Sequence, residues 1–431
     1  MSESKSSPGR GFNLTPFQRH SILVICFLLY MINFMDRQVL SVVLEPMRED
    51  LGLNDSQAGL LQSGFFLSMA LLTLPASYLV DRWSRRKALA LTAVVWSVFT
   101  YVTGMGKSFM GVLLPRMLTG IGEAGFPPAG SAMISAAYSP QARSRVLGIF
   151  NAAIPLGAAL GTILGGYLAQ HYGSWRTPFY IFAVPGVILG IAALFLKDYK
   201  TVRDTDETGR GRSAFSSLAA LFRIPTLKWL YLGYALQLAM TMAFIVWGPA
   251  FLMRAHNMDV AKAGAVMGGI GLLGVIGAPL GGVIADLWQK RNPRGRVYTA
   301  LAAILISSGL MALALRFDLS GIGLVFGAVL GVFLAMGIPA INSISQDVVN
   351  PALKGISWGM AGLVAMLCGA AWAPWAVGLM SDFMGGGSAG LKSAMLLMPL
   401  CGLVAAVLFW IASKPYPADL ARVEGASLES E

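Results

Sequence analysis

Charged side chains are scarce in this chain: Asp, Glu, Lys and Arg make up 12% of its 431 residues, about half of the share usual in soluble domains. Cysteine and histidine are also rare, with three of each, and they are too scattered for a disulfide framework or a metal site. The sequence has no Walker A motif, so we expect no ATP-driven step. No nucleophile–base set stands within the apolar runs. We therefore expect no metal, no cofactor and no enzymatic activity.

Apolar residues and glycine are abundant instead. Apolar residues make up 56% of the chain, and glycine accounts for 50 positions. This leaves room for about a dozen membrane-spanning helices of ~20 residues. The net charge of +11 does not indicate nucleic-acid binding, because the basic residues stand in short links between apolar runs, as they do in membrane proteins. The composition therefore indicates an integral membrane protein.

The apolar runs divide the chain into two sets of six. The first set covers about 20–43, 56–80, 88–105, 110–138, 144–168 and 178–196, and the second covers about 229–253, 262–285, 297–315, 320–345, 355–380 and 390–412. We predict an all-α integral membrane fold of twelve transmembrane helices in two pseudo-symmetric six-helix bundles. The predicted domains are an N-terminal tail (1–18), a first bundle (19–196), a linker (197–228), a second bundle (229–412) and a C-terminal tail (413–431).

Lysine and arginine are unevenly distributed between the links. Alternate links, together with both tails and the 197–228 linker, hold 23 of the 32 basic residues, whereas the opposite links hold seven. Because basic residues are enriched in cytoplasmic loops, we expect both termini and the linker in the cytoplasm. An even number of spans is consistent with this orientation.

Two patterns recur in the two halves of the chain. Asp81, after the second apolar run, recurs after the eighth run as Asp286, 205 residues later. A Pro-x-x-Arg sequence at 140–143 recurs as Pro-x-x-Lys at 351–354, 211 residues later. The nearly equal offsets indicate that a six-helix unit has been duplicated.

The link after the second run resembles the loop signature of the major facilitator superfamily, Gly-x-x-x-Asp-Arg-x-Gly-Arg-Arg/Lys. Residues 77–86 follow it except that Ser77 and Ser84 replace two glycines, and residues 116–122 resemble the fourth-helix signature of the superfamily. The resemblance covers about residues 20–412 and implies the major facilitator fold. It also implies that the loop takes part in conformational gating, although positive-inside topology explains the arginines equally well. The gating candidates are Asp81, Arg82, Arg85, Arg86, Arg143, Arg145 and Asp286.

Within the superfamily, four stretches look Spinster-like: residues 33–37, 120–124, 145–157 and 373–382. The anion–cation symporters, which carry sugar acids and similar organic anions, share the Asp-Arg pair of the first helix and the Arg and Glu of the fourth. The sequence is therefore similar to both groups, with the Spinster-like group as first choice.

Four ionisable residues lie well inside predicted spans: Asp36 and Arg37 in the first, and Arg116 and Glu123 in the fourth. Buried charges cost a few kcal/mol each, so they indicate a functional site. Counting ~1.5 Å per residue from the start of each apolar run places Asp36 and Arg116 at similar heights and Glu123 nearer the cytoplasm. We therefore predict an Asp36–Arg116 pair, with Glu123 as the titrating carboxyl. Arg37 is either a contact for an anionic substrate or a snorkelling cation.

Burial and a neighbouring arginine shift the pKa of a carboxyl in opposite directions, so a carboxyl whose arginine partner can leave is able to exchange a proton near neutral pH. We predict proton coupling at Asp36 and Glu123 and substrate binding at Arg37 and Arg116, and the resemblance implies similar roles for these positions. A structural charge network that only fixes helix packing is the alternative. Further substrate-binding candidates are polar or aromatic residues within the spans: Tyr30, Asn33, Asn151, Gln237, Trp247, Asn342 and Trp372.

These features predict a proton-coupled secondary transporter that works by alternating access. Because Arg37 and Arg116 can bind carboxylate or phosphate, the expected substrate is an organic anion or an acidic amphipathic, lipid-like molecule. A proton symporter for small organic carboxylates, such as sugar acids or aromatic acids, is the alternative, and a receptor without transport activity is a weaker one. We expect a multi-pass monomer in the cell membrane, the inner membrane of a bacterium. Its partners would be protons, lipid and a small-molecule or lipid-like substrate, and no nucleic acid.

Overall fold

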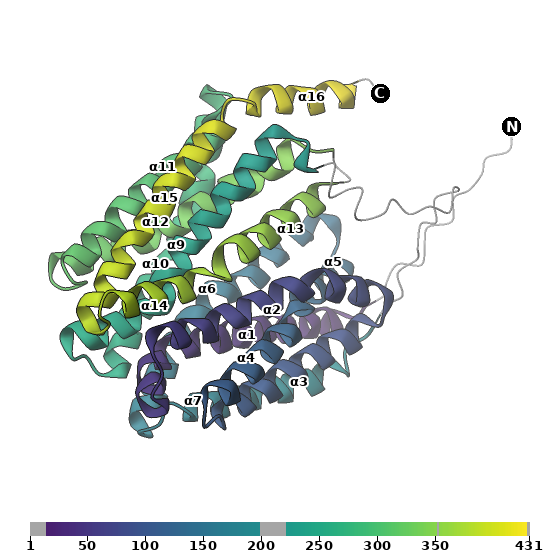
Figure 1. Cartoon of the computed structure of the whole chain (residues 1–431). Coiled ribbons are helices and arrows are strands. Elements are labelled where there is room, and N and C mark those ends of the chain that lie inside the picture. Colours follow the sequence, from purple (N-terminus) through teal and green to yellow (C-terminus); the bar gives the residue numbers. More distant parts are fainter. Residues whose placement is uncertain (1–13, 199–220, 351–352, 429–431) are drawn as a thin grey trace, which may run out of the picture.

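A computed structural model of the chain describes the backbone of residues 14–198, 221–350 and 353–428, and the side chains of these residues except 77–82, 140, 144 and 424–428. Within these ranges every regular element is a helix. Ten helical segments in this part of the chain are long and apolar enough to cross a membrane, and α7 is a shorter apolar helix. Figure 1 shows the helices in two bundles that lie side by side.

The first bundle consists of α1 (Pro16–Leu51), α2 (Asp55–Arg82), α3 (Arg85–Gly104), α4 (Phe109–Ala124), α5 (Phe126–Ala137), α6 (Pro140–His171) and α7 (Thr177–Ala193). The second consists of α9 (Pro225–His256), α10 (Val260–Arg291), α11 (Gly295–Arg316), α12 (Ile322–Asp347), α13 (Lys354–Ala365), η2 (Met366–Ala370), α14 (Ala373–Phe383) and α15 (Gly387–Ala412), and α16 (Tyr416–Leu428) follows it. α4 and α5 together form one broken crossing, as do α13, η2 and α14. The described residues therefore form twelve crossings, which confirms the predicted fold class.

The break between α4 and α5 falls at Gly125, just ahead of two consecutive prolines, Pro127 and Pro128. Because proline has no N–H group, the carbonyls of Glu123 and Ala124 lose the donors that a continuous helix would provide. The N–H group of Gly125 donates to the Glu123 carbonyl instead. Glu123 therefore lies in the last turn of α4, at the middle of the broken crossing.

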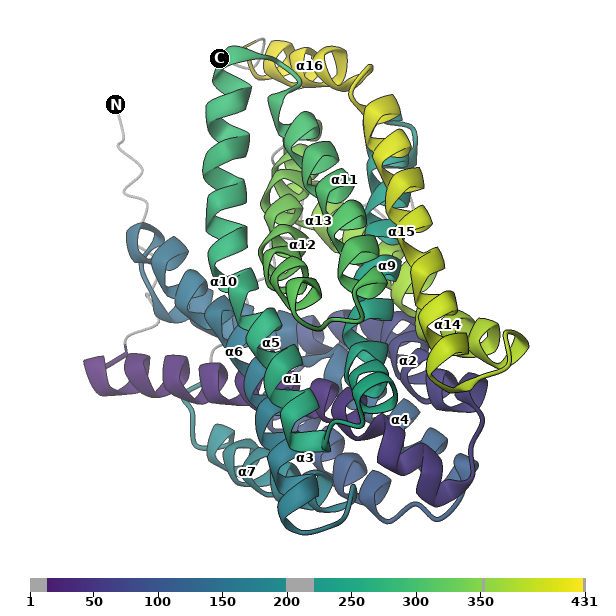
Figure 2. The same ribbon diagram turned by 90° about the vertical axis from the view of Figure 1, so that its left-hand side faces the viewer.

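The two bundles repeat one packing scheme. In the first, α2 packs on α4, α3 on α7 and α1 on α6. In the second, α10 packs on α12, α11 on α15, and α9 on η2 and α14. The contacts between the bundles are reciprocal as well, because α6 packs on α10 and α2 packs on α14 (Figure 2). This arrangement agrees with the duplication inferred from the sequence.

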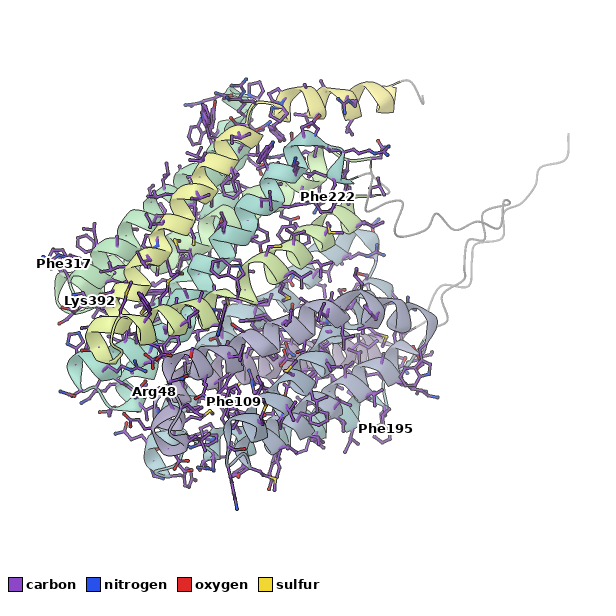
Figure 3. The ribbon with its side chains drawn as sticks, viewed as in Figure 1. Arg48, Phe109, Phe195, Phe222, Phe317 and Lys392 are labelled. Carbon is purple, nitrogen blue, oxygen red and sulfur yellow. The ribbon has the colours of Figure 1, made fainter. Side chains whose placement is uncertain are left out.

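The bundles approach each other most closely at one end. We call it the closed end, and it carries the α1–α2 and α14–α15 connections; the linker end, opposite to it, carries residues 198 and 221 (Figure 1). Arg48 and Lys392 mark the closed end in Figure 3, and Phe195 and Phe222 mark the linker end. At the closed end α14 packs on α2, whereas α13, which continues toward the linker end, packs on α9, α12 and η2. The bundles therefore diverge toward the linker end.

The first helix is longer than the apolar run at 20–43 predicts. It begins with a capping box, in which the Thr15 side chain accepts from the Gln18 N–H group and the Gln18 side chain accepts from the Thr15 N–H group. It ends at Gly52, whose φ of 62° suits the left-handed conformation of a helix C-cap. Hydropathy locates the apolar part of a helix, and the capping residues decide where the helix begins and ends.

Two helices begin or lie in segments that are polar in the sequence. α9 begins at Pro225, inside the predicted linker at 197–228, and residues 199–220 of that linker lie outside the described residues. The predicted polar tail contains α16, which packs on the second bundle through two buried residues. The Tyr416 hydroxyl donates to Asp347 at 2.8 Å, and the Asp419 carboxylate accepts from the Thr226 backbone N–H group at 3.1 Å. The tail is therefore a docked helix, at least as far as Leu428.

Candidate functional site

The four intramembrane charges come together in the middle of the first bundle. Asp36, Arg116 and Glu123 are fully buried, and Arg37 is 8% exposed. None of the four faces lipid, so Arg37 does not snorkel. We call these four residues the central charge cluster.

Arg37 and Glu123 form the ion pair of this cluster. The Arg37 Nε donates to the Glu123 Oε2 at 2.6 Å, and both side chains are buried. Asn33 lies close to the carboxylate without a hydrogen bond of ordinary geometry. Ion pairs of this kind are strongly coupled to the protonation of the carboxylate, because no water screens the two charges.

The predicted Asp36–Arg116 ion pair is wrong. The Asp36 carboxylate accepts from the Thr100 hydroxyl at 3.3 Å. Arg116 donates to the backbone carbonyl of Asp36 at 3.4 Å and to the Gln62 side chain at 3.5 Å, and both hydrogen bonds are long. The Arg116 Nε has no hydrogen-bond partner among the described residues.

The predicted depth of Glu123 was wrong for a physical reason. The estimate counted from the first apolar residue of each run, but α1 extends well past its apolar part, and the fourth crossing continues through α5. Both helices therefore project beyond the apolar layer, and the middle of each is displaced from the estimate. Glu123 and Arg37 both lie near these middles and meet at one height.

Two aromatic rings flank the arginines of the cluster. The guanidinium carbon of Arg37 lies 4.5 Å from the ring centroid of Phe34 and 5.9 Å from that of Phe65. The guanidinium carbon of Arg116 lies 4.7 Å from the Phe65 centroid. Such cation–π contacts stabilise charge where no carboxylate is in reach. Sequence reasoning missed Phe65, because an aromatic residue in an apolar run carries no distinguishing pattern.

The predicted substrate-binding residues of the first bundle lie in different surroundings. Tyr30 is buried and stacks on Phe150, with ring centroids 4.5 Å apart, so it packs α1 against α6. Asn33 belongs with the central charge cluster, as stated above. Asn151 is exposed on α6.

In the second bundle, Trp247 is fully buried and its indole N–H group donates to the Pro374 carbonyl at 2.9 Å, which is a packing contact between α9 and α14. Gln237 is buried on α9. Asn342 and Trp372 are half-buried, and each bonds within its own helical segment. The structure does not bring these four residues together with the central charge cluster.

Two of the predicted gating residues, Arg86 and Asp286, form contacts within their own bundles. Arg86 donates to the Leu196 carbonyl at 3.4 Å, and Asp286 pairs with Arg296 at 2.8 Å. Arg85 is buried at the start of α3, and Arg143 and Arg145 are exposed near the start of α6. The side chains of Asp81 and Arg82 lie outside the described residues. The gating role predicted for Asp81 and Arg82 therefore stays a prediction.

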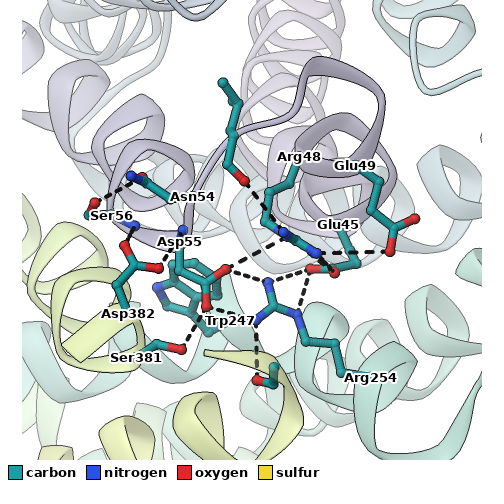
Figure 4. Close-up of polar contacts among 12 residues, drawn as sticks. Glu45, Arg48, Glu49, Asn54, Asp55, Ser56, Trp247, Arg254, Ser381 and Asp382 are labelled. Atoms are coloured by element: carbon teal, nitrogen blue, oxygen red, sulfur yellow. Dashed lines mark hydrogen bonds and ion pairs between the residues drawn. The ribbon is translucent and has the colours of Figure 1, made fainter. Parts of the chain in front are cut away.

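Ionic contacts between the bundles occur at the closed end, and sequence reasoning missed them. Arg254 of α9 contacts Asp55 with both Nη atoms, at 2.8 and 2.7 Å, and its Nε donates to Glu45 at 2.8 Å (Figure 4). Arg48 pairs with Glu45 at 2.7 Å and lies 3.7 Å from Asp55. Glu45 and Asp55 are buried, so their two negative charges depend on Arg254 and Arg48 for compensation.

Two residues of α14 complete these contacts. The Ser381 hydroxyl donates to Asp55 at 2.6 Å. The Asp382 carboxylate accepts from the backbone N–H groups of Asp55 and Ser56 at 3.0 and 2.8 Å, so a carboxylate of the second bundle caps a helix of the first. We call the whole set the inter-bundle network; its residues are Glu45, Arg48, Asp55, Arg254, Ser381 and Asp382.

Backbone segments also touch at the closed end. A β-carbon built at Gly59 would lie 2.2 Å from the Pro374 carbonyl oxygen, and one at Gly378 would lie 2.1 Å from the Asp55 carbonyl oxygen. Only glycine permits such an approach between α2 and α14. The inter-bundle network and these glycine contacts together close this end of the molecule.

A family model described as the Major Facilitator Superfamily matches residues 26–374. The chain belongs to the Major Facilitator Superfamily. Similar proteins include an MFS-type efflux pump of Mycolicibacterium smegmatis, 29% identical over 90% of this chain and 91% of its own length. Protein spinster homolog 1 of Xenopus tropicalis is 27% identical over 94% of this chain and 83% of its own length.

Solved structures show the same fold. A bacterial homolog of the human lysosomal transporter Spinster, in an inward-facing and unoccupied conformation, superposes with a TM-score of 0.85 at 23% identity, over 94% of this chain and 99% of that chain. A D-xylose-proton symporter superposes with a TM-score of 0.69 at 15% identity, over 91% and 97% of the two chains. The predicted Spinster-like grouping is confirmed. The protein is a multi-pass transporter of the cell membrane and not an enzyme.

Proposed function

We propose that this transporter couples the movement of a proton to that of an organic anion or an acidic amphipathic molecule, with the central charge cluster as the coupling site. The observation that carries the proposal is the buried Arg37–Glu123 pair, joined by a 2.6 Å hydrogen bond. Protonation of Glu123 removes the charge that holds Arg37. A proton arriving at this carboxylate therefore releases a guanidinium.

The charges of the cluster support an anionic substrate. With Asp36 and Glu123 ionised, the two carboxylates balance the two guanidiniums. When a proton neutralises Glu123, the cluster carries one net positive charge, which a carboxylate or phosphate of the substrate can balance. Arg37, as the most exposed of the four residues, is the first contact that we propose for this anion.

Arg116 supports the same proposal. Its two hydrogen bonds are long, and its Nε has no partner among the described residues. It is fully buried against Phe65 in this conformation, so it stabilises an anion only after the aromatic ring moves. Arg116 is therefore the second, deeper contact in our proposal.

Alternating access completes the proposed mechanism. We propose that the linker end faces the cytoplasm, because the links at that end carry most of the basic residues. The conformation described is then inward-facing, with the inter-bundle network holding the outer side closed. Opening to the outside requires that Arg254 and Asp382 leave their partners on α1 and α2.

A second class of substrate remains an alternative to the lipid-like acid. A small carboxylate, such as a sugar acid or an aromatic acid, satisfies the same guanidinium chemistry as a lipid-like acid. The likeness to an efflux pump supports export. The domain boundaries at 1–18, 19–196, 197–228, 229–412 and 413–431 likewise stay proposals.

Purified protein in liposomes that contain a pH-sensitive dye tests the coupling. Aromatic carboxylates, sugar acids and lysophospholipids are added in turn, and proton movement is followed together with substrate–substrate exchange. Glu123→Gln is expected to abolish proton movement and retain exchange, since the amide stays neutral. The matched control is Glu49→Gln, a carboxylate whose side chain is 66% exposed at the closed end. Proton movement of parental size in Glu123→Gln contradicts the proposal.

A further inference from the structure

Phe65 lies between the central charge cluster and the second bundle. Its side chain is fully buried on α2, and its ring is in reach of both guanidiniums, 4.7 Å from that of Arg116 and 5.9 Å from that of Arg37. A change in the position of either guanidinium therefore changes its cation–π interaction energy with this ring.

The backbone of Phe65 is held firmly against α4. The Ser68 hydroxyl lies within hydrogen-bonding distance of the Phe65 carbonyl, at 2.9 Å, and of the Met117 carbonyl, at 2.8 Å. A β-carbon built at Gly120 would lie 2.6 Å from the Phe65 carbonyl oxygen, so α2 and α4 are in backbone contact. Because the backbone is fixed, the ring is the part of Phe65 that can respond.

Phe65 also belongs to an apolar cluster that crosses between the bundles. Its buried members are Phe65, Phe66, Met69, Ala124 and Ala370, and Leu238, Met242, Met366 and Ala371 pack against them. Met366 and Ala370 delimit η2, the π-helical turn of the eleventh crossing. A π-helical turn has wider hydrogen bonding than an α-helix and frequently occurs at functional sites. The second bundle thus meets the apolar cluster that contains the ring at a segment suited to local rearrangement.

We propose that Phe65 is the positioning residue through which the state of the Arg37–Glu123 pair reaches the second bundle. This inference rests on the proposed function, because it assumes that Glu123 exchanges a proton. When Glu123 is protonated, Arg37 leaves the carboxylate and shifts against Phe34 and Phe65. The Phe65 ring then turns against η2 and changes the contact between α2 and the eleventh crossing. The other charged or titratable side chains around Glu123 are Asp36 and Tyr30 on α1 and Arg116 on α4.

The test measures the separation of the bundles at the closed end as a function of pH. Lys107 and Ser320 are exposed, one in each bundle, and each is replaced by cysteine and spin-labelled in a background that carries Cys26→Ala, Cys368→Ala and Cys401→Ala. The distances between the two spin labels are measured by double electron–electron resonance in lipid nanodiscs, over a range from acidic to basic pH. The parent is expected to convert from a short to a long separation as Glu123 becomes protonated.

Phe65→Leu is expected to reduce the pH-dependent change in the ratio of long to short separations about thirtyfold, the size of effect that one desolvated cation–π contact supplies. Phe65→Tyr retains the ring face and is expected to preserve the response. Phe66→Leu is the matched control, since Phe66 loses the same atoms and its ring packs on Phe65, with centroids 5.3 Å apart. If Phe65→Leu does not fold, Phe65→Met, which is unbranched and similar in size, replaces it.

The outcomes separate this inference from the proposed function. A parental response that persists in Phe65→Leu overturns the inference alone, and so does an equal loss in Phe66→Leu, which would indicate general packing. A parent that does not respond to pH, or a Glu123→Gln variant that responds as the parent does, overturns the proposed function and the inference together. Loss in Phe65→Leu, retention in Phe65→Tyr and retention in Phe66→Leu support the inference.

Discussion

Arg254 of the second bundle binds Asp55 of the first through both Nη atoms, at 2.8 and 2.7 Å. The same guanidinium donates to Glu45 through Nε at 2.8 Å. One cation therefore pairs with two buried carboxylates that belong to consecutive helices of the other bundle, and Arg48 supplies the second positive charge. When the bundles separate at this end, both carboxylates lose their contacts with Arg254 and must be solvated by water instead. The closed conformation therefore depends on this arginine.

Arg254→Met is expected to destabilise the protein by about 3–5 kcal/mol, because it leaves the two buried carboxylates of Glu45 and Asp55 with only the partly exposed Arg48 beside them. The thermal unfolding midpoint in detergent measures the loss. Arg48→Met is the control: the Arg48 side chain is 26% exposed, and its loss is expected to cost no more than about 1 kcal/mol. Equal losses in the two variants would contradict this account, whereas adding Glu45→Gln and Asp55→Asn to Arg254→Met should restore part of the stability.

Asp382→Ala is expected to favour separation of the bundles, because α2 loses a carboxylate cap worth about 0.5–2 kcal/mol that is present only when the closed end is closed. The distance between spin labels at Lys107 and Ser320 should increase. Thr15→Ala removes the N-cap of α1, where the Thr15 hydroxyl accepts from the Gln18 N–H group. That cap does not join the bundles, so this variant should leave the distance unchanged, and a change of the same size there would argue against the assignment.

Gly59→Val is expected to prevent closure and to hold the closed end open. The β-carbon of a valine at position 59 would by itself overlap the Pro374 carbonyl oxygen, which belongs to the backbone and cannot turn away. The same spin-label pair should report a long separation at every pH. Gly362→Val makes the same substitution in α13, where a built β-carbon meets nothing within 4 Å, and it should behave as the parent does. A short separation in Gly59→Val would show that α2 and α14 can adapt.

The raised pKa of Tyr416, a residue that lies outside the membrane-spanning helices, predicts how the stability of the protein depends on pH. Burial, followed by the neighbouring Asp347 carboxylate, raises the pKa of Tyr416 above its usual value of about 10. A group with a raised pKa stabilises the folded state below its unfolded pKa and loses this contribution as pH rises through the folded pKa. The stability of the parent should therefore decline above about pH 10, and Tyr416→Phe should decline less. Thermal unfolding across that range measures the difference, and identical slopes would contradict the prediction.

The sequence was sufficient to predict the twelve crossings, because hydropathy acts locally along the chain. It was also sufficient to locate the buried charges, since they stand inside apolar runs, where a charge is costly wherever it points. It did not reveal the pairing of Arg37 with Glu123. That pairing depends on the relative height of α1 and α4, and an error of two helical turns in either helix changes the partner.

The inter-bundle network could not be predicted for a different reason. Glu45, Asp55, Arg254 and Asp382 stand at helix ends, where charged residues are ordinary, and nothing local distinguishes them from loop charges that determine topology. Their association requires that residues about 200 to 330 positions apart meet, which is a property of how the two bundles dock in one conformation. The gating function was accordingly sought in the loops that match a known signature.

The glycine contacts of α2 with α14 have a consequence for ion leakage. Any membrane transporter must prevent small ions from passing while its cargo site is open to one side. A β-carbon built at Gly59 or Gly378 would lie 2.2 or 2.1 Å from a carbonyl oxygen of the facing segment, which is less than the ~2.7 Å that a water oxygen needs from a carbonyl oxygen. A hydrated sodium or potassium ion therefore finds no path between these helices, and this barrier needs no bulky side chain to move aside when the molecule reopens.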